Sequence, residues 1–361
     1  MHPAISCNPV LSVALACILL TSCAPFRSDR RGLPTDSPEL SNPASPTVTA
    51  DYLKANGMLL TAIPAPGSAD ISTGSIYKSR PDGAEKVLLT DDGSMPSWTP
   101  DGDIIFVSSR SGTSQIWLMS VEGHNPRQVG LIGSDIFPAM PLMSRNGLIV
   151  FMAVTNVGGA QSIWKMQSDG TGLEKLVGEN MIPSQPSLAL SGIWITFTSE
   201  TEEPYHRQIW RIHTDGTNLK QLTFLGDPDY PDANASMISP DEKWVAFFSG
   251  KESDKGEAGR TQHPDTWGHR NVAVIPATGG PRRNLTSCKP TTEQVNTGHG
   301  YPECIAADNP TWSPDGRWIL HDTDASGIWM IDVNGQNSQQ LSTLTRHMVR
   351  VPLRYMSSSR D

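Results

Sequence analysis

The sequence predicts an all-β fold, a six-bladed β-propeller whose blades are four-stranded antiparallel sheets. Three observations predict it. Short apolar runs alternate with turn residues, and no long window shows sustained helical periodicity. The composition, with 31 Gly and 29 Pro in 361 residues, suits many short strands and turns. A unit that joins an anchor residue, mostly aromatic, to a turn glycine recurs six times at intervals typical of propeller blades.

The stretch from Asn309 to Leu341 reads as one complete unit. Four short apolar runs alternate with turns, which is the pattern of a four-stranded meander. Pro314-Asp315-Gly316 supplies a tight turn, because Pro presets φ, Asp bonds its own backbone and Gly tolerates a positive φ. We therefore expect Trp312 and Asp315 to serve packing and turn formation.

The repeat is seen most clearly at the third strand of each unit. Each anchor residue there is followed six positions later by the glycine of a turn, mostly in Asp-Gly or Asn-Gly pairs typical of tight hairpins. The pairs are Tyr77/Gly83, Trp117/Gly123, Trp164/Gly170, Trp210/Gly216, Val274/Gly280 and Trp329/Gly335. The successive glycines lie 40, 47, 46, 64 and 55 residues apart, which indicates one blade per interval.

The two ends of this region complete the blade count. Residues 56–60 read as a second strand before the Tyr77 unit, which lacks its first strand. Residues 349–356, with Pro352 at the expected place, read as a first strand without a blade of its own. Joining them gives a sixth blade shared by both ends, which removes the exposed edges of an open meander. Seven blades are the alternative.

Two of these elements carry a family resemblance. Ser313-Pro314-Asp315-Gly316 and Ile163-Trp164-Lys165-Met166 with the following Asp169-Gly170, together with Leu-Thr endings such as Leu222-Thr223, resemble the TolB-like family of propeller repeats. The resemblance covers about residues 55 to 357. It implies the propeller fold, whereas the role of TolB in a cell-envelope complex is only an analogy here.

The first 22 residues read as a secretory signal. The apolar stretch from Val10 to Leu20 is too short for an ordinary membrane span and ends in Leu20-Thr21-Ser22-Cys23. That ending resembles the lipobox of bacterial lipoproteins, which implies lipidation at Cys23. Ala24, in place of an Asp, favours the outer membrane. A plain apolar strand or an uncleaved anchor is the alternative.

We expect three parts: a lipoprotein signal peptide (1–22), a lipidated disordered tether rich in Pro, Ser and Thr (23–50), and the propeller (51–361). The tether would hold the propeller to the bacterial outer membrane, facing the periplasm or the cell surface. Cys288 and Cys304 then remain as an even pair in a compartment that permits disulfides, and we expect them to be joined. Two free thiols or half of a zinc site are the alternatives.

The net charge excludes one class of partner. Lys and Arg number 28 against 37 Asp and Glu, so the formal charge is −9. A nucleic-acid-binding surface is therefore not expected, and a cationic partner or a metal ion suits the chain better.

Two long insertions are the first candidates for a ligand site. They cover about 250–271, inside one unit, and about 287–308, between two units. Second-to-third strand loops and blade-to-blade connections share one face, so we expect these two loops to be neighbours. Their candidate ligand-binding residues are His263, Asp265, Trp267, His269, His299 and Tyr301. The histidines could ligate a transition metal or act as acid and base, whereas the plain alternative is polar loop residues.

Carboxylates on the blade-to-blade connections are the second candidates. They include Asp91, Asp135, Asp229 and Asp308, which could hold Ca²⁺ at the mouth of the central channel. The plain alternative is that Asp starts and ends turns.

Together these features favour a non-catalytic binding or scaffold module for an envelope protein, a peptide or a glycan. No GxSxG motif and no phosphate-binding glycine loop occur. The alternative function is a metal-dependent polysaccharide lyase or hydrolase that uses the loop histidines.

Overall fold

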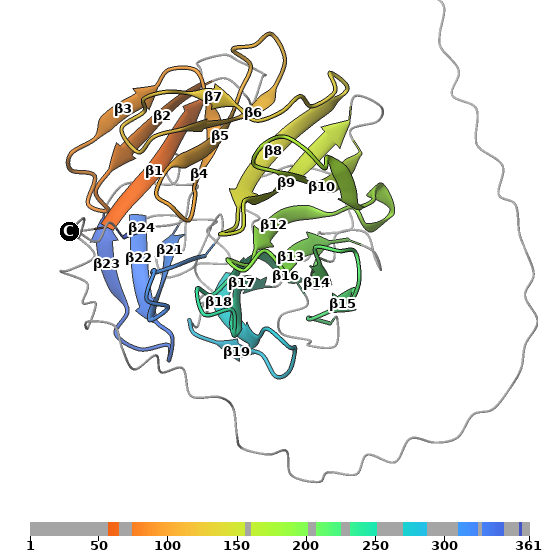
Figure 1. The fold of residues 1–361 in the computed structure, drawn as a ribbon. Helices are drawn as coiled ribbons and strands as arrows, with labels where there is room; N and C mark the ends of the chain where they lie inside the picture. The colour runs from red at the N-terminus through yellow and green to blue at the C-terminus, as the bar shows by residue number, and fades with distance from the viewer. Residues whose placement is uncertain are drawn as a thin grey trace, which may run out of the picture. The chain divides into compact units, whose positions relative to one another are not determined.

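The computed structural model describes residues 57–64, 74–155, 160–200, 207–224, 232–250, 270–286, 310–323, 327–342 and 354–355. In these residues, 24 strands pair into six four-stranded antiparallel sheets, accompanied by one short 3₁₀ helix. The sheets follow one another around a common centre as the blades of a propeller (Figure 1). The predicted six-bladed, all-β fold is confirmed.

Blades 1 to 3 occupy the first half of the propeller. Blade 1 consists of β24 (Arg354–Tyr355), β1 (Gly57–Pro64), β2 (Gly74–Ser79) and β3 (Val87–Thr90). Blade 2 consists of β4 (Ser94–Trp98), β5 (Ile104–Ser108), β6 (Gln115–Met119) and β7 (Arg127–Gln128). Blade 3 consists of β8 (Ile136–Met143), β9 (Leu148–Thr155), β10 (Gln161–Gln167) and β11 (Glu174–Val177), followed by the 3₁₀ helix Glu179–Met181.

Blades 4 to 6 complete it. Blade 4 consists of β12 (Ser184–Leu188), β13 (Trp194–Ser199), β14 (Gln208–His213) and β15 (Lys220–Gln221). Blade 5 consists of β16 (Asp232–Ile238), β17 (Trp244–Gly250), β18 (Arg270–Pro276) and β19 (Arg283–Asn284). Blade 6 consists of β20 (Thr311–Trp312), β21 (Trp318–Thr323), β22 (Gly327–Asp332) and β23 (Gln339–Ser342).

Both ends of the propeller region contribute to blade 1. β24 pairs antiparallel with β1, with Tyr355 opposite Gly57 and Arg354 opposite Met58. Leu59 of β1 then packs in one apolar cluster with Leu320 and Met330 of blade 6. The ring therefore closes at six blades, as predicted, and the seven-bladed alternative is wrong.

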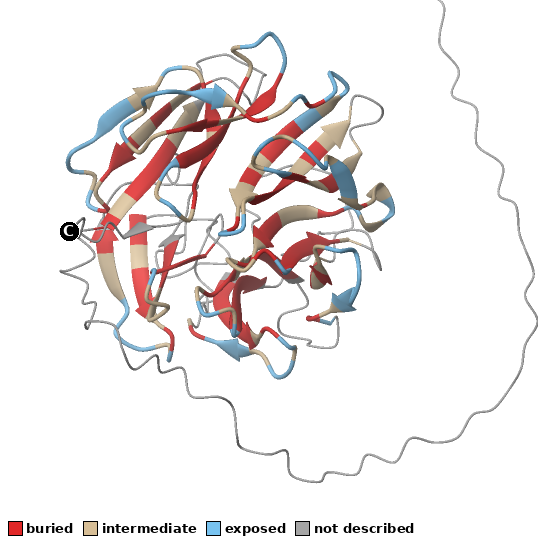
Figure 2. Cartoon of the chain, in the orientation of Figure 1, coloured by how far each residue is buried: buried red, intermediate tan, exposed pale blue. Residues whose placement is uncertain are grey.

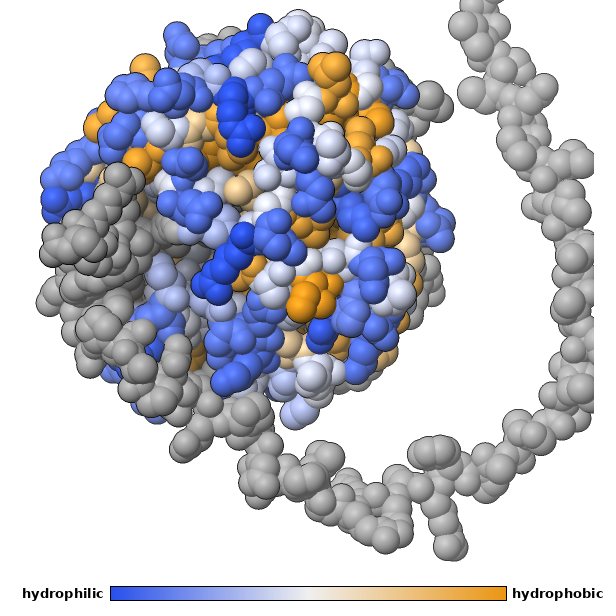
Figure 3. Space-filling view, in the orientation of Figure 1, coloured by the Kyte–Doolittle hydropathy of each residue, from blue (hydrophilic) through white to orange (hydrophobic). Residues whose placement is uncertain are grey.

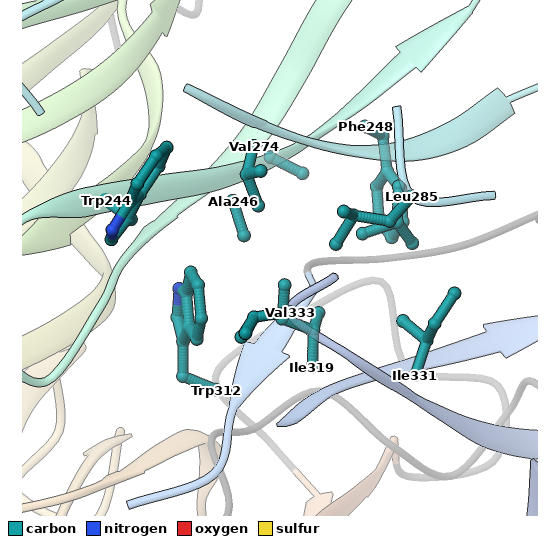
Figure 4. Packing of buried hydrophobic residues seen from close by; sticks show 11 residues of the cluster. Trp244, Ala246, Phe248, Val274, Leu285, Trp312, Ile319, Ile331 and Val333 are labelled. Atoms are coloured by element: carbon teal, nitrogen blue, oxygen red, sulfur yellow. The ribbon is translucent and has the colours of Figure 1, made fainter. Parts of the chain in front are cut away.

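The core is divided into layers between blades. Each pair of neighbouring blades shares one buried apolar cluster, so the strands are buried on both faces near the centre (Figure 2). Between blades 5 and 6, Trp244 lies over Trp312, with Val333 and Ile319 beside them (Figure 4). The indole N–H of Trp312 donates to the Met237 carbonyl at 2.9 Å, and the residue is buried. The packing role predicted for Trp312 is confirmed.

The first turns of blades 5 and 6 are each stabilised by their own serine and aspartate. In blade 6 the Ser313 hydroxyl donates to Asp315 at 2.5 Å and accepts from the Trp318 N–H at 2.9 Å. Gly316 then takes a φ of +71°, which favours glycine. The turn role predicted for Asp315 is confirmed.

Among the residues that the structure describes, no helix has the length and apolar character needed to span a bilayer. The predicted signal peptide and tether, including Cys23, lie outside the described residues, as do Cys288 and Cys304.

Candidate functional site

Antiparallel order divides the loops between two faces of the propeller. One face, here called the connection face, carries the blade-to-blade connections and the loops between second and third strands. The opposite face, called the turn face, carries the first-to-second and third-to-fourth turns, which are short in every described blade. The connection face therefore has the room for a ligand site.

Both long insertions belong to the connection face, as predicted. β17 and β18 pair as far as Gly250 and Arg270, so residues 251–269 connect the two strands on this face. The second insertion joins β19 to β20. Their candidate ligand residues lie outside the described residues and stay predictions: His263, Asp265, Trp267, His269, His299 and Tyr301.

The two described carboxylates of the predicted Ca²⁺ set lie on the connection face. Asp91 follows β3 and Asp135 precedes β8, and both are exposed. Asp229 and Asp308 lie outside the described residues. Within the described part of the chain, no three His, Cys, Asp or Glu side chains come together as a metal site would require. The Ca²⁺ site stays a prediction.

Other acidic residues of these connections are already paired with cations. Arg110, in the loop between β5 and β6, lies 3.5 Å from the Asp92 carboxylate and stacks 5.0 Å from the ring centroid of Trp117. Its guanidinium also donates to the Thr90 hydroxyl at 3.0 Å. Asp92 therefore helps to fix the β3–β4 connection to blade 2. The sequence alone did not indicate this pairing, because Arg110 and Asp92 come from different loops.

Glu179 offers a test of this electrostatic arrangement. Its carboxylate accepts a hydrogen bond from Lys175 at 2.5 Å, and this bond lowers the pKa of Glu179 below its usual value of 4.5. Lys175→Met should raise that pKa toward 4.5, measured by NMR titration of the carboxyl carbon. Because the folded pKa is the depressed one, the stability from this pair is present above pH 4.5 and is lost as the pH falls through the folded pKa. An unchanged Glu179 pKa in the variant would contradict the assigned cause.

The innermost strands contain a repeated backbone feature that the sequence reading missed. In each of four blades, one non-glycine residue beside a β-bulge has a positive φ between 46° and 54°: Met95, Met140, Gln185 and Ala235. The N–H of Met140 donates to the Met95 sulfur at 3.4 Å, and the N–H of Ala235 donates to Gln185 Oε1 at 3.1 Å. These bonds tie successive blades together beside the channel.

A sequence signal for the bulges does exist. Proline follows the left-handed residue in three of the four strands, at Pro96, Pro141 and Pro186. Proline has no N–H and is found in strands mainly at edges and bulges. Its recurrence in these three first strands therefore marks the strand edge that faces the channel.

Comparison with known proteins supports the fold. No family model and no curated protein sequence matches the chain. Among solved structures, TolB from Acinetobacter baumannii is 17% identical with a TM-score of 0.55, over 78% of this chain and 62% of that one. The putative TolB from Agrobacterium tumefaciens is 14% identical with a TM-score of 0.55, over 84% and 99%. The chain spans less than two thirds of the length of the Acinetobacter protein.

A propeller enzyme is also among the similar structures. An oligogalacturonate lyase solved in complex with manganese is 12% identical with a TM-score of 0.52, over 76% of this chain and 71% of that one. The structure defines a β-propeller in which both long insertions belong to one face, the connection face. More particularly, the chain has a TolB-like six-bladed propeller fold.

Proposed function

We propose that this chain is a non-catalytic binding module, anchored by lipid in the bacterial cell envelope, that captures a protein, peptide or glycan on its connection face. The observation that carries the proposal is the asymmetry of the two faces. Short turns close the turn face, whereas the connection face receives both long insertions. Long loops on a rigid scaffold commonly carry binding sites.

The lipobox-like Leu20-Thr21-Ser22-Cys23 supports the anchoring part of the proposal. The likeness to TolB structures is compatible with a scaffold role in an envelope assembly, although at 17% identity it bears on the fold alone. A propeller that displays loops on one face needs no chemistry of its own to act as a receptor.

Replacing residues 251–269 with a short Gly-containing turn should abolish ligand capture and preserve the fold. The structure permits this change because Gly250 and Arg270 are paired neighbours, so a tight turn can join them. The measurement is affinity capture from bacterial envelope extracts on the immobilised chain, with circular dichroism to verify folding. The matched control is Ile193→Ser on the turn face, which should capture normally. Equal capture by the deletion variant would overturn the proposal.

A metal-dependent lyase or hydrolase that acts on polysaccharide is the alternative function, suggested by His263, His269 and His299 and by the likeness to the manganese-bound oligogalacturonate lyase. Repeating the capture with chelator and measuring the metal content of the purified chain separate the two. Bound metal that is lost on substitution of the histidines, together with cleavage of an acidic polysaccharide, would favour the enzyme.

A further inference from the structure

An exposed apolar surface lies on the connection face at the end of blade 3. Leu131 is 83% exposed, Phe137 39% and Ile182 48%. Val154, which pairs with Phe137 across the two strands, is half-buried. We call these four residues the apolar crest. In Figure 3 apolar atoms gather at the upper right, where Figure 1 draws the start of β8 and the end of β9. Large exposed apolar patches on a soluble domain mark interaction sites.

Strand register places two members of the apolar crest together, Phe137 and Val154. Phe137 lies opposite Val154, so the two side chains share one face of the blade. Val154 is on the same side of β9 as Val150, which packs against blade 4. Met181 packs in that same cluster, and Ile182 follows it directly.

Leu131 extends the apolar crest toward blade 2. The next residue, Ile132, is buried in the cluster between blades 2 and 3. The apolar crest therefore runs across the end of blade 3, from its blade 2 side to its blade 4 side.

The loops that display the apolar crest are held in place by buried polar groups. The Gln115 side chain, which is buried, accepts from the Ile132 N–H at 2.8 Å and donates to the Ile132 carbonyl at 2.9 Å. These two bonds hold the backbone of Ile132, next to Leu131, in the way that a neighbouring strand would. A preordered surface loses little conformational entropy on binding.

Ile182 is held in an unusual conformation as well. Its φ of 43° and ψ of 55° are left-handed, which is an outlier for a β-branched residue. Its N–H donates to the Glu179 carbonyl at 2.9 Å, which closes the 3₁₀ turn. Strained backbone of this kind is found preferentially at binding sites and switches.

The charges near the apolar crest indicate the sign of the charge that a partner would carry. Three cations described on the connection face are already beside carboxylates, in the pairs Arg110–Asp92, Lys175–Glu179 and Arg207–Glu200. Asp135, two residues before Phe137, is exposed and makes no ion pair with any residue that the structure describes. Among the residues that the structure describes, the uncompensated charge beside the apolar crest is therefore negative. A second copy of the chain, at −9, or an anionic bilayer would be repelled.

We propose that the apolar crest is a docking surface for an extended protein segment that presents apolar side chains flanked by lysine or arginine. The segment would bury its apolar side chains on Leu131, Phe137 and Ile182, and its cation would lie near Asp135. The inference rests on the proposed function, since it names a place on the connection face and a chemical class of ligand.

The test is selection of random peptides, displayed on phage, on the immobilised full chain. The selected peptides should combine apolar residues with Lys or Arg. The double variant Leu131→Ser/Phe137→Ser should bind them about ten- to hundred-fold more weakly per lost anchor. Asp135→Asn should weaken binding less and should reduce its dependence on salt.

The matched control is Ile193→Ser/Leu219→Ser, which removes two apolar side chains of 58% and 49% exposure from the turn face. It should leave peptide affinity unchanged. Selected peptides that are acidic, that bind the crest variant as well as the parent chain, or that fail to appear would overturn the inference. So would self-association or binding to phosphatidylglycerol vesicles that the crest substitutions abolish. Peptides that lose binding on replacement of 251–269 but not on crest substitution would refute this inference and leave the proposed function standing.

Discussion

Gly170→Ala should lower the free energy of unfolding by about 2–5 kcal/mol. Gly170 forms the turn between β10 and β11 with a φ of +88°, a conformation that costs an L-residue about 1–2 kcal/mol. A Cβ there would also meet the Cα of Gly130, in blade 2, at 2.5 Å. The obstacle is backbone, so blades 2 and 3 must separate, and overpacking of this kind adds about 1–3 kcal/mol.

Gly216→Ala is the matched control for Gly170→Ala. Both glycines sit in an Asp-Gly-Thr turn, and in both turns the Asp carboxylate accepts from the Thr N–H at 2.9 Å. Gly216 has a φ of +85°, but a Cβ there would meet nothing within 4 Å. Gly216→Ala should therefore cost only about 1–2 kcal/mol. Urea denaturation followed by tryptophan fluorescence measures both values. Equal losses would mean that the approach of Gly170 to Gly130 contributes nothing.

These glycines show which features of the fold could be predicted from the sequence and which could not. The Asp-Gly pairs predicted the turns, because a tight turn depends on neighbouring residues. They could not predict that Gly170 touches Gly130, 40 residues earlier. Local chemistry was therefore sufficient for the blades, whereas the contacts between blades required the structure.

The cations that follow the anchor aromatics also make contacts between blades that the sequence could not predict. Lys78, Lys165 and Arg211 each occupy the position after an anchor residue. Each donates to a backbone carbonyl of the next blade, at 3.1 Å to Val121, 2.6 Å to Thr214 and 2.8 Å to Ala277 respectively. The repeated Lys or Arg was visible in the sequence, but its partner becomes known only when the blades are placed side by side.

The candidate site was predicted less fully, for a physical reason. The connection face and its two insertions follow from strand order, which the repeat determines. The residues inside a long loop follow no period and no pairing rule, so His263 or Tyr301 cannot be placed from spacing. The apolar crest was also missed, because Leu131 and Phe137 look like core residues until exposure is measured.

Glu242 occupies the first turn of blade 5, which departs from the repeat. The turn after Ser239-Pro240-Asp241 lacks the usual glycine, and Glu242 takes the left-handed conformation there with a φ of 61°. Its carboxylate accepts from the Ser191 N–H at 2.7 Å, from the Ser191 hydroxyl at 2.9 Å and from the indole N–H of Trp194 at 3.1 Å. The guanidinium of Arg211 stacks on Trp194, 4.0 Å from the centroid of its ring. Burial lowers the pKa of Arg211, and the charge of Glu242 opposes that shift.

Glu242→Gly should therefore destabilise the propeller, although it restores the usual turn residue. Glycine removes the cost of the left-handed conformation, which is about 1–2 kcal/mol for an L-residue. The change also removes three hydrogen bonds to a carboxylate, each worth about 1.5–3 kcal/mol, and leaves the buried Trp194 N–H without this acceptor. Glu242 is only partly buried, so water replaces part of the lost bonding, and we expect a net loss of about 2–4 kcal/mol in urea denaturation. A more stable variant would mean that turn strain outweighs the contact between blades 4 and 5.

A double-mutant cycle with Trp194→Phe separates the two contributions. In the parent chain, Trp194→Phe removes the indole donor and leaves the Glu242 carboxylate less well bonded, so it should cost about 1–3 kcal/mol. In the Glu242→Gly background the same change should cost much less, because the bond is already absent. The coupling free energy between the two positions should then reach about 1–2 kcal/mol. Additive effects would show that Glu242 acts only through its turn, whereas strong coupling would show that an exception to the repeat is retained because it joins two blades.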